Sequence, residues 1–304
     1  MELRHLRYFV AVVEEQSFTK AAEKLFIAQP PLSRQIQNLE NELGIQLFER
    51  GSRPLQTTVA GQFFYQHAVK LLSNAEEIKS MTKRVGTTDR VIRMGFVASL
   101  LYGLLPRITY LYRQQQPQLK VELVEMSTKD QIQALKEGKI DVGFGRLRIS
   151  DPAVRRVLLR EERLMVAVHS SHPFSTQKEG VYLSDIVEEN MFFYPSTSKP
   201  NFSTQMMNIF SEHGLDPQHT KEVREIQLAL GLVAAGEGIC VVPDSAHTIQ
   251  FPHLNYVPLL DEDAVSPIFL ATRNMEESED IKALFDCIYQ IYDLEAIKYD
   301  RSVF

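Results

Sequence analysis

The sequence predicts an α+β multidomain protein with an N-terminal winged helix-turn-helix, a long linker helix and a C-terminal α/β domain of two lobes. Two short amphipathic segments separated by a tight break lie between residues 17 and 43. Apolar residues from 64 to 85 then recur at spacings of four and three, the heptad pattern of a long paired helix. From residue 90 apolar strands alternate with helices, which is typical of a parallel sheet covered by helices. We expect domain boundaries at 1–58, 59–88 and 89–304.

Charge and composition fit a soluble DNA-binding protein with an acidic second part. The net charge of -6 over 304 residues does not by itself indicate nucleic-acid binding. Residues 1–90, however, hold 12 basic and 10 acidic side chains, whereas residues 91–304 hold 21 and 29. Cys240 and Cys287 have no metal-ligand spacing, so we expect buried free thiols. Without an apolar run long enough to span a bilayer, or a signal peptide, we expect a cytoplasmic protein.

The helix-turn-helix is predicted from residues 17–43. Thr19 is placed to cap its first helix, and the second begins at Gln29-Pro30-Pro31, since proline is tolerated in a first helical turn. Apolar residues at spacings of four, three and four bury one face of this second helix: Leu32, Ile36, Leu39 and Leu43. Its other face carries side chains that can bind base edges: Gln29, Ser33, Arg34 and Gln37. Pro30 and Pro31 can contact a thymine methyl group. The alternative is a helical hairpin with a solvated polar face.

The segments on either side complete this domain. Apolar residues between 3 and 13 predict a first helix that packs behind the pair. After Gly44, the alternation of Ile45, Leu47 and Phe48 predicts a short strand. The turn at 51–54 then predicts a wing whose Arg50 and Arg53 bind phosphates, although such a turn is often merely solvated.

The linker helix is predicted to begin after Thr58, as its cap, and to run to about Val85. Its apolar positions form one seam: Phe64, Ala68, Leu71, Ala75, Ile78, Thr82 and Val85. A small domain cannot bury so long a seam, so we expect a homodimer through this helix. Packing on the following domain is the alternative. Residues 86–89 are the expected hinge.

The rest of the chain predicts two α/β lobes. The first has strands at 91–97, 120–125 and 140–144 and helices at 104–116 and 130–136. The second has strands at 164–168, 191–194, 223 and 239–242 and helices at 201–213 and 227–235. A strand at 268–271 and a helix at 277–292 are expected to return to the first lobe. Lobe I is then about 89–161 and 267–304 and lobe II about 162–266, with a small ligand expected between them.

Residues 1–58 resemble the DNA-binding domain of LysR-type transcriptional regulators. The matching positions are Phe9, Ser17-Phe18-Thr19, Ala21-Ala22, Leu25, Gln29-Pro30-Pro31-Leu32-Ser33, Ile36, Leu39-Glu40, Leu43-Gly44, Leu47-Phe48, Arg50, Thr57 and Gly61. Ala28 departs from the Ser or Thr of many members and removes one candidate phosphate contact. The remainder resembles the family's linker helix and periplasmic-binding-protein-like effector domain, so the resemblance covers the whole chain.

Several segments resemble the subgroup of activators that respond to cis,cis-muconate and benzoate. These segments are MELRHLRYFVAVVEEQSFTKAAEKL, LLYGLLPRI, KIDVGFGRL, YPSTSKPNF and EIQLALGLVAAGEGI. The resemblance implies an allosteric activator of aromatic-compound degradation genes, with no cofactor. It also implies dimers that assemble into a homotetramer, an interrupted palindrome on double-stranded DNA, and contact with RNA polymerase.

The expected inducer is a small dicarboxylate held by hydroxyls and helix N-termini. Ser99 and Leu100 follow the first strand and Thr128 follows the second, at the carboxyl ends where ligands gather in such sheets. Across the expected cleft a helix opens at Pro200-Asn201-Phe202, and the resemblance matches these segments to muconate-binding ones. Arg146 is a plausible charge partner at the edge of the cleft. For Ser99 and Thr128, helix capping is the alternative.

A second pocket for an aromatic acid, inside lobe I, is implied by the resemblance alone. It would be touched by Arg160 and Tyr292, although the charged run 160–163 is otherwise typical of a solvated ion-pair cluster.

The sequence does not predict an enzyme. It holds no HExxH, no GxSxG and no dinucleotide-binding glycine motif, and we expect no metal site. Three alternatives remain: a transport receptor, which fits only the second part, a helix-turn-helix fused to a catalytic domain, and a LysR-type regulator of another pathway with a different small acid as effector.

Overall fold

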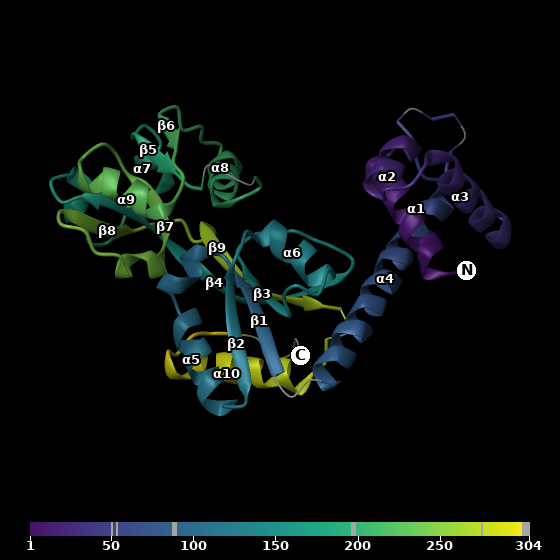
Figure 1. Ribbon diagram of the computed structural model, residues 1–304. Helices are drawn as coiled ribbons and strands as arrows, with labels where there is room; N and C mark the ends of the chain where they lie inside the picture. The colour runs from purple at the N-terminus through teal and green to yellow at the C-terminus, as the bar shows by residue number, and fades with distance from the viewer. Residues whose placement is uncertain (50, 53, 87–89, 196–198, 275, 300–304) are drawn as a thin grey trace.

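The computed structural model describes residues 1–304 apart from 50, 53, 87–89, 196–198, 275 and 300–304. Figure 1 shows a small helical domain at the N-terminus, a long helix leading away from it, and two lobes that contain the sheets. The C-terminal helix lies beneath the first lobe, close to where the long helix ends. The predicted arrangement of helical domain, linker helix and α/β lobes is therefore present.

The N-terminal domain packs three helices around one apolar core. These are α1 (Leu3–Glu15), α2 (Phe18–Lys24) and α3 (Gln29–Leu43), and α3 has proline in its first turn, as predicted. It ends at Gly44, whose φ of 69° is the left-handed conformation that favours glycine. The buried side chains come from all three helices and the segment after them: Leu6, Phe9, Val12, Ala21, Leu32, Ile36, Leu39 and Leu47.

The predicted cap of α2 is wrong by two residues. Ser17, not Thr19, is the cap, and its Oγ accepts a hydrogen bond from the backbone N–H of Lys20 over 3.4 Å. Thr19 lies inside the helix. Both residues are good caps by type, and the extended backbone of Ser17 decides between them.

The predicted strand at residues 45–48 is also wrong. Among the described residues of this segment, a single antiparallel bridge joins Phe48 to Thr57. The Glu40 carboxylate accepts hydrogen bonds from the N–H of Leu47 at 2.7 Å and of Phe48 at 3.3 Å. These two N–H groups therefore bind a side chain of α3 and are not free to pair with a neighbouring strand. Ile45 is accordingly left 52% exposed while Leu47 is buried.

Helix α4 (Val59–Gly86) is the predicted linker helix. Thr58 caps it as expected, because its Oγ1 accepts from the N–H of Gly61 over 2.9 Å. The expected single seam, however, divides in two. Phe64 packs on the N-terminal core, with its ring 5.0 Å from that of Phe9, whereas Leu71 and Ile78, further along the same stripe, are exposed.

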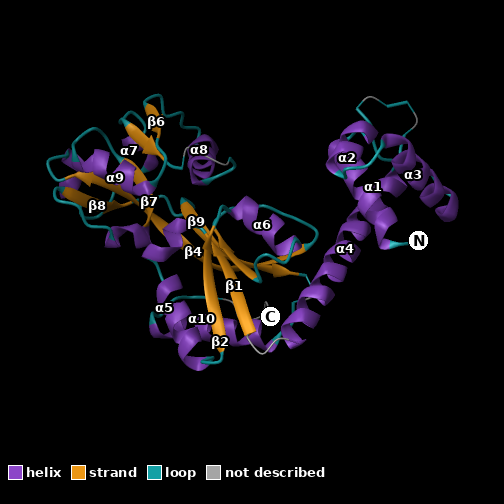
Figure 2. Cartoon of the chain, viewed as in Figure 1, coloured by secondary structure: helices purple, strands orange, loops and turns teal. Residues whose placement is uncertain are grey.

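Lobe I contains the predicted parallel unit. Strand β1 (Arg90–Phe96) lies between β2 (Leu119–Glu125) and β3 (Val142–Gly145) and is parallel to both. The connections include η1 (Ala98–Tyr102), α5 (Leu105–Gln115) and α6 (Thr128–Lys136), and α10 (Glu279–Leu294) packs beside α5. Figure 2 shows helices on both faces of these strands.

Two long antiparallel strands run between the lobes. Strand β4 (Val154–His169) pairs first with β9 (Val265–Arg273) and then with β7 (Cys240–Pro243) and β8 (Leu254–Pro258). Only residues 164–168 of β4 were predicted as strand. Its first half alternates poorly because it is rich in arginine, and the guanidinium of Arg156 lies 4.0 Å from the ring centroid of Phe269 on β9. At this position an arginine packs on an aromatic ring of the neighbouring strand, where an alternating pattern would have placed an apolar side chain.

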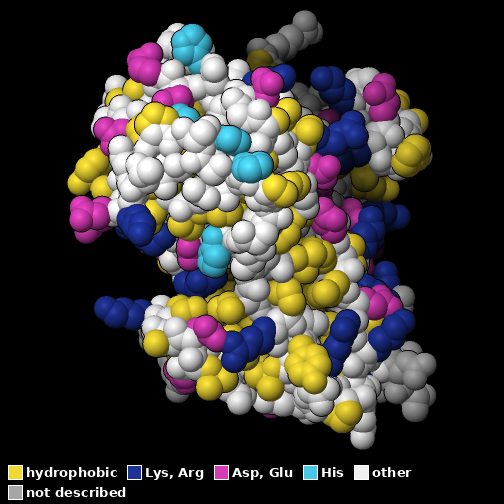
Figure 3. Space-filling model, turned by 90° about the vertical axis from the view of Figure 1, so that its left-hand side faces the viewer, with side chains coloured by type: hydrophobic (Ala, Val, Ile, Leu, Met, Phe, Trp, Pro, Cys, Tyr) yellow, Lys and Arg dark blue, Asp and Glu magenta, His cyan; other side chains and the backbone are white. Residues whose placement is uncertain are grey.

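Lobe II has its own core. The parallel strands β5 (Met191–Phe193) and β6 (Thr220–Glu222) lie near α8 (Phe202–Glu212) and α9 (Ile226–Ala234). The short elements are η2 (Pro173–Thr176), α7 (Leu183–Ile186) and η3 (Asp244–Thr248). In Figure 3 a waist separates this upper lobe from the lower one, and hydrophobic side chains gather around it and over the lower lobe.

Candidate functional site

The candidate DNA-binding surface is the outer face of α3. Because Leu32, Ile36 and Leu39 are buried in the domain core, the opposite face points outward. The predicted residues on that face are exposed, except for a partly buried Ser33: Gln29, Pro30, Pro31, Arg34 and Gln37. In Figure 1, α3 lies at the outer edge of the N-terminal domain, on the side away from the lobes. An exposed helix with amide, hydroxyl and guanidinium groups can enter a major groove.

The predicted wing lies only partly within the described residues. Arg50 and Arg53, predicted to bind phosphates, are outside them. The turn between is closed by a hydrogen bond from the N–H of Glu49 to the carbonyl of Gln56 at 2.9 Å. Ser52 Oγ accepts from the N–H of Gln56 at 3.0 Å, and the N–H of Leu55 donates to the carbonyl of Gln16 at 3.2 Å, which holds this loop close to the helix-turn-helix.

Arg146 is the centre of the candidate effector site in lobe I. It follows β3, it is 3% exposed, and its Nε donates to Ser99 Oγ over 2.9 Å. Its backbone N–H donates to Thr128 Oγ1 over 3.3 Å, and one terminal nitrogen donates to Ser266 Oγ over 3.1 Å. The carboxyl ends of β1, β2 and β3 therefore bring together Ser99, Thr128 and Arg146, as predicted.

Arg146 is buried and ion-paired rather than lying at an edge. Its guanidinium is 2.6 Å from Glu162 Oε2, and Glu162 Oε1 accepts from the N–H of Ser245 over 2.7 Å. Arg160 is 3.8 Å from the same carboxylate. Burial alone would raise the pKa of Glu162, but Arg146, the Ser245 bond and Arg160 together hold that pKa below its ordinary value. The pair is charged, and it joins lobe I to η3 of lobe II.

Neither Ser99 nor Thr128 is a helix cap. The cap of α6 is Ser127, whose Oγ accepts from the N–H of Asp130 over 3.2 Å. Thr128 is buried and packs against Gly145, where a Cβ atom would lie only 2.8 Å from the threonine side chain. Ser99 lies within η1, which has no side-chain cap. Both hydroxyls are thus directed to Arg146, so the capping alternative is excluded.

On lobe II, Asn201 and Phe202 form the start of α8. Asn201 Oδ1 accepts from the N–H of Thr204 over 3.0 Å, and its Nδ2 donates to the carbonyl of Pro195 over 2.7 Å. The Phe202 ring lies 5.2 Å from that of Tyr194. Pro200 is exposed beside this turn. The N–H groups of Phe202 and Ser203, before the capped Thr204, have no partner within the helix, so this end can accept an anion.

A small cavity in lobe I is lined by the other predicted pair, Arg160 and Tyr292. Its volume is about 20 Å³. Its lining is Leu100, Gly103, Leu104, Leu105, Ile108, Phe144, Arg146, Leu159, Arg160, Ile268 and Tyr292. The space suits about one water molecule, whereas an apolar cavity that binds benzene measures roughly 150 Å³. An aromatic acid would have to open it.

Arg160 and Tyr292 are neighbours in this cavity. The guanidinium carbon of Arg160 lies 6.0 Å from the centroid of the Tyr292 ring. Burial raises the pKa of Tyr292 to about 12, so its hydroxyl keeps its proton near neutral pH. Only 17% of the Arg160 side chain is exposed, which excludes the solvated-cluster interpretation for this residue.

The sequence did not predict Glu162, Ser245, Ser266 or Tyr194 as members of this region. They come from β4, η3, β9 and the end of β5, and no local motif joins them. Glu162 is part of a charged run that suggested a surface. Its burial could have been predicted only from the course of β4, which carries Glu162 between the lobes and next to Arg146.

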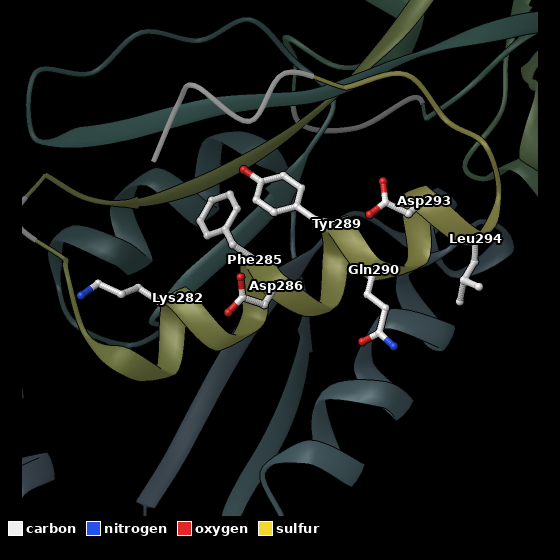
Figure 4. Close-up of a pocket in the computed structure, with 7 residues that line it drawn as sticks. All are labelled: Lys282, Phe285, Asp286, Tyr289, Gln290, Asp293 and Leu294. Carbon is white, nitrogen blue, oxygen red and sulfur yellow. The ribbon is translucent and has the colours of Figure 1, made fainter.

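A large open hollow lies elsewhere, along α10. It measures about 740 Å³, and Figure 4 shows its lining side chains projecting from that one helix. They are Lys282, Phe285, Asp286, Tyr289, Gln290, Asp293 and Leu294. The Tyr299 ring stacks on Tyr289 at 4.9 Å, and its hydroxyl donates to Asp293 over 2.7 Å. The chain's own C-terminal segment thus lies over this helix, and the hollow contains none of the predicted residues.

Two further expectations concern the chemistry of the chain. Cys240 and Cys287 are both buried and free, as expected. Within the described residues, no cluster of three or more histidine, cysteine or acidic side chains could hold a metal ion. The helices of that part of the chain are also too short or too polar to cross a membrane.

Family comparisons divide the chain in the same way. Residues 3–62 match the family described as "Bacterial regulatory helix-turn-helix protein, lysR family", and residues 86–291 match the "LysR substrate binding domain". The chain is 67% identical over 296 residues to the HTH-type transcriptional regulator BenM of Acinetobacter baylyi, covering 97% of both chains. It is 45% identical to the probable cat1 operon transcriptional activator of Acinetobacter lwoffii, covering 96% of both.

Solved structures give the same relationship. Full-length BenM aligns over 99% of this chain and 100% of its own, with 65% identity and a TM-score of 0.69. The BenM effector binding domain with its effector benzoate aligns with 72% of this chain and 99% of its own, at 59% identity and a TM-score of 0.70. Full-length CbnR complexed with its target DNA covers 95% and 99%, at 27% identity and a TM-score of 0.61.

Proposed function

The chain belongs to the LysR family of bacterial transcriptional regulators, and on that basis we propose which inducer it senses and how the signal reaches DNA. It is a regulator and not an enzyme, and its relatives place it among activators of aromatic-compound degradation genes that respond to a small-molecule effector. Its helix-turn-helix binds DNA. The DNA-bound role proposed below would place it in the cytoplasm.

The proposed inducer is a small dicarboxylate such as cis,cis-muconate. The observation that carries this proposal is the meeting of Ser99, Thr128 and Arg146 at the carboxyl ends of three parallel strands. These residues can offer hydroxyl and backbone donors to one carboxylate. Asn201 and Phe202, at the start of α8, would offer backbone N–H groups to the other. The positive charge of Arg146 favours an anion, although Glu162 neutralises part of it.

Benzoate is the proposed second effector. Arg160, Arg146 and Tyr292 line a cavity whose other walls are mostly apolar, which suits a ring that carries one carboxylate. The benzoate complex of the related BenM effector domain supports this class of ligand. Because the cavity is small, binding would have to push apart the side chains around it, including Leu100 on η1.

The proposed DNA contacts follow from the exposure of α3. Gln29, Ser33, Arg34 and Gln37 would read base edges, and Pro30 and Pro31 would contact a thymine methyl group. Arg50 and Arg53 are proposed for phosphates from the sequence alone. The functional units would be residues 1–58 for DNA, 59–88 for dimerisation and 89–304 for the effector.

We also propose a homodimer through α4, which assembles into a homotetramer on an interrupted palindrome and contacts RNA polymerase. Phe63, Leu71 and Ile78 support the dimer, since they are 65%, 47% and 66% exposed on α4. A dimer would place two recognition helices at two half-sites.

Calorimetric titration of the full-length protein with cis,cis-muconate tests the inducer. Thr128→Ala should weaken binding about tenfold, because one hydrogen bond to a charged ligand contributes about 1.5–3 kcal/mol. Thr220→Ala, at an exposed position of lobe II, is the control and should bind as the wild type does. Equal affinity for Thr128→Ala would remove that residue from the site.

A gel-shift titration tests the DNA contact. Arg34→Ala should weaken binding to the specific promoter by about 1–3 kcal/mol. Arg4→Ala, an exposed arginine on α1, should have little effect. Unchanged affinity for Arg34→Ala would contradict the proposed role of α3.

The second candidate is a LysR-type regulator of another pathway with a different small acid as effector. A change of one side chain in such a site can change the preferred ligand. A thermal-shift screen of small carboxylates separates the two, because a ligand that binds only the folded state raises the melting temperature.

A further inference from the structure

Tyr194 lies at the end of β5 in lobe II, beside the candidate effector residue Phe202. It is 5% exposed, and its ring packs 5.2 Å from Phe202. The carbonyl of the next residue, Pro195, accepts the hydrogen bond from Asn201 Nδ2. Tyr194 is therefore built into the same turn that opens α8.

The hydroxyl of Tyr194 is buried and has no hydrogen-bond partner among the described residues. A buried polar group without a partner is uncommon in folded proteins and is costly to leave unpaired. Burial holds the pKa of Tyr194 well above its ordinary value, so the hydroxyl is a neutral donor at physiological pH. A donor in this position requires an acceptor that the described residues do not supply.

The surroundings of this hydroxyl indicate the charge of that acceptor. The Tyr194 ring packs on Phe202, a candidate effector residue, and the charges of Arg146 and Glu162 both influence the pKa of Tyr194. The Oγ of Ser245, whose N–H binds Glu162, is likewise buried without a partner. Two unpaired hydroxyls thus lie in the region where Arg146 provides the positive charge. Hydroxyl donors beside a guanidinium favour an oxyanion.

We propose that Tyr194 is a further effector-recognition residue, whose hydroxyl donates a hydrogen bond to a carboxylate of the inducer. This rests on the proposed function, since it assumes an acidic ligand between the two lobes. It adds a donor from lobe II to those of Ser99 and Thr128 in lobe I. A site that contains such a donor rejects analogues that lack the acceptor, because the donor then stays unpaired. Tyr194 would therefore determine specificity as well as affinity.

Calorimetric titration of the full-length protein with cis,cis-muconate, comparing wild type with Tyr194→Phe, tests the proposal. The phenylalanine keeps the ring packing on Phe202 and removes only the hydroxyl. We expect binding to weaken about tenfold or more. Tyr110→Phe, which removes an exposed hydroxyl from α5, is the matched control and should bind as the wild type does.

The melting temperature without ligand separates recognition from a structural role. Removing an unpaired buried hydroxyl should leave that temperature unchanged or raise it. Equal affinity of Tyr194→Phe and wild type would overturn the proposal. Weaker binding would also overturn it if the ligand-free variant melted at a lower temperature than the ligand-free wild type. A wild-type protein that does not bind muconate would instead contradict the proposed inducer.

A crystal structure of the wild-type protein with cis,cis-muconate provides a test that requires no variant. We expect the Tyr194 hydroxyl within hydrogen-bond distance of a carboxylate oxygen. A hydroxyl that binds only protein groups in that complex would overturn the proposal.

Discussion

Burial divides the arginines of this chain into two kinds with different tasks. Arg146 and Arg273 are 3% and 1% exposed and are held by carboxylates, with Arg273 3.1 Å from Asp141 and 3.0 Å from Glu276. Arg34 is exposed on α3. A buried guanidinium with fixed partners organises the backbone around it, whereas an exposed one can exchange water for a phosphate or a base. The local sequence does not distinguish a buried arginine from an exposed one.

His213 couples folding stability to pH. Its Nδ1 hydrogen-bonds the carbonyl of Ile209 over 2.8 Å, and its Nε2 is 3.1 Å from Asp263. The backbone bond, followed by the Asp263 carboxylate, raises the pKa of His213. A raised pKa means that the folded state prefers the protonated ring. The stabilisation is therefore complete below the unfolded pKa of about 6.5 and is lost as the pH rises through the folded value.

We expect His213→Gln to lower the melting temperature more at pH 6 than at pH 8. Melting curves of both proteins at these two pH values measure the difference. His219→Gln, at an exposed position of the same lobe, is the control. A loss that is the same at both pH values would show that the charge of His213 does not contribute.

Phe26 is a residue in an unfavourable backbone conformation. It lies in the turn between α2 and α3 with a φ of 54°, and 95% of it is exposed. The left-handed conformation destabilises a bulky residue by about 1 kcal/mol. Because the ring is exposed, its burial contributes little stability to offset this. Phe26→Asn should therefore stabilise the domain by about 1 kcal/mol, since asparagine tolerates this conformation.

The matched control is Phe26→Ala, which also removes the ring but lacks the polar side chain by which asparagine can hydrogen-bond locally in this conformation. Thermal or urea denaturation measures both variants. Equal stability of the two would indicate that the conformation of the backbone is not the cause.

At the scale of elements, local patterns were reliable where an element depends on its own residues. Helix α3 and strands β1 to β3 were predicted because periodicity, first-turn proline and terminal glycine act within a few residues. The segment at 45–48 was mispredicted because its N–H groups bind Glu40, which belongs to α3. The first half of β4 was missed because Arg156 packs on Phe269 of another strand. Such contacts leave no signature in the local sequence.

Helix α4 divides its apolar residues between two tasks. Phe64 belongs to the core of the N-terminal domain, while Leu71 and Ile78 form part of an exposed ridge. A second α4 that covered this ridge would bury it. The double variant Leu71→Glu with Ile78→Glu should dissociate the proposed dimer, because carboxylates would repel one another across the interface.

Analytical ultracentrifugation measures this change in mass. Gln66→Glu, on another face of the same helix, is the control and should keep the wild-type mass. A double variant that sediments as the wild type does would exclude this ridge as the interface.

At the scale of the whole molecule, the sequence predicted groups from both lobes, including the start of α8, but not the ion pair that links the lobes. Ser99, Thr128 and Arg146 follow parallel strands, whose carboxyl ends must meet at one edge of a sheet. Glu162 and Ser245 join them only because β4 carries the chain into lobe II and η3 returns beside it. That link depends on how the two lobes are connected, which periodicity cannot show.

The same connection makes Glu162 important for stability. Its carboxylate pairs with Arg146 of lobe I and accepts a hydrogen bond from the backbone of Ser245 in lobe II, and both charges are buried. Glu162→Gln would leave the Arg146 charge buried without its partner, which typically costs about 3–5 kcal/mol. The neighbouring pair of Glu161 and Arg148 has a similar N···O distance of 2.6 Å but exposed side chains. Such surface pairs contribute about 0–1 kcal/mol.

Comparing Glu162→Gln with Glu161→Gln therefore isolates burial as the cause, because the two changes are chemically identical and adjacent in sequence. For an effector domain of this size, the first variant should lower the melting temperature by roughly 6–20 °C and the second by a few degrees at most. Thermal denaturation of the ligand-free protein measures both. If the two variants melted together, the link between the lobes would be carried by other contacts, such as the hydrogen bond between Tyr102 of η1 and Gln227 of α9.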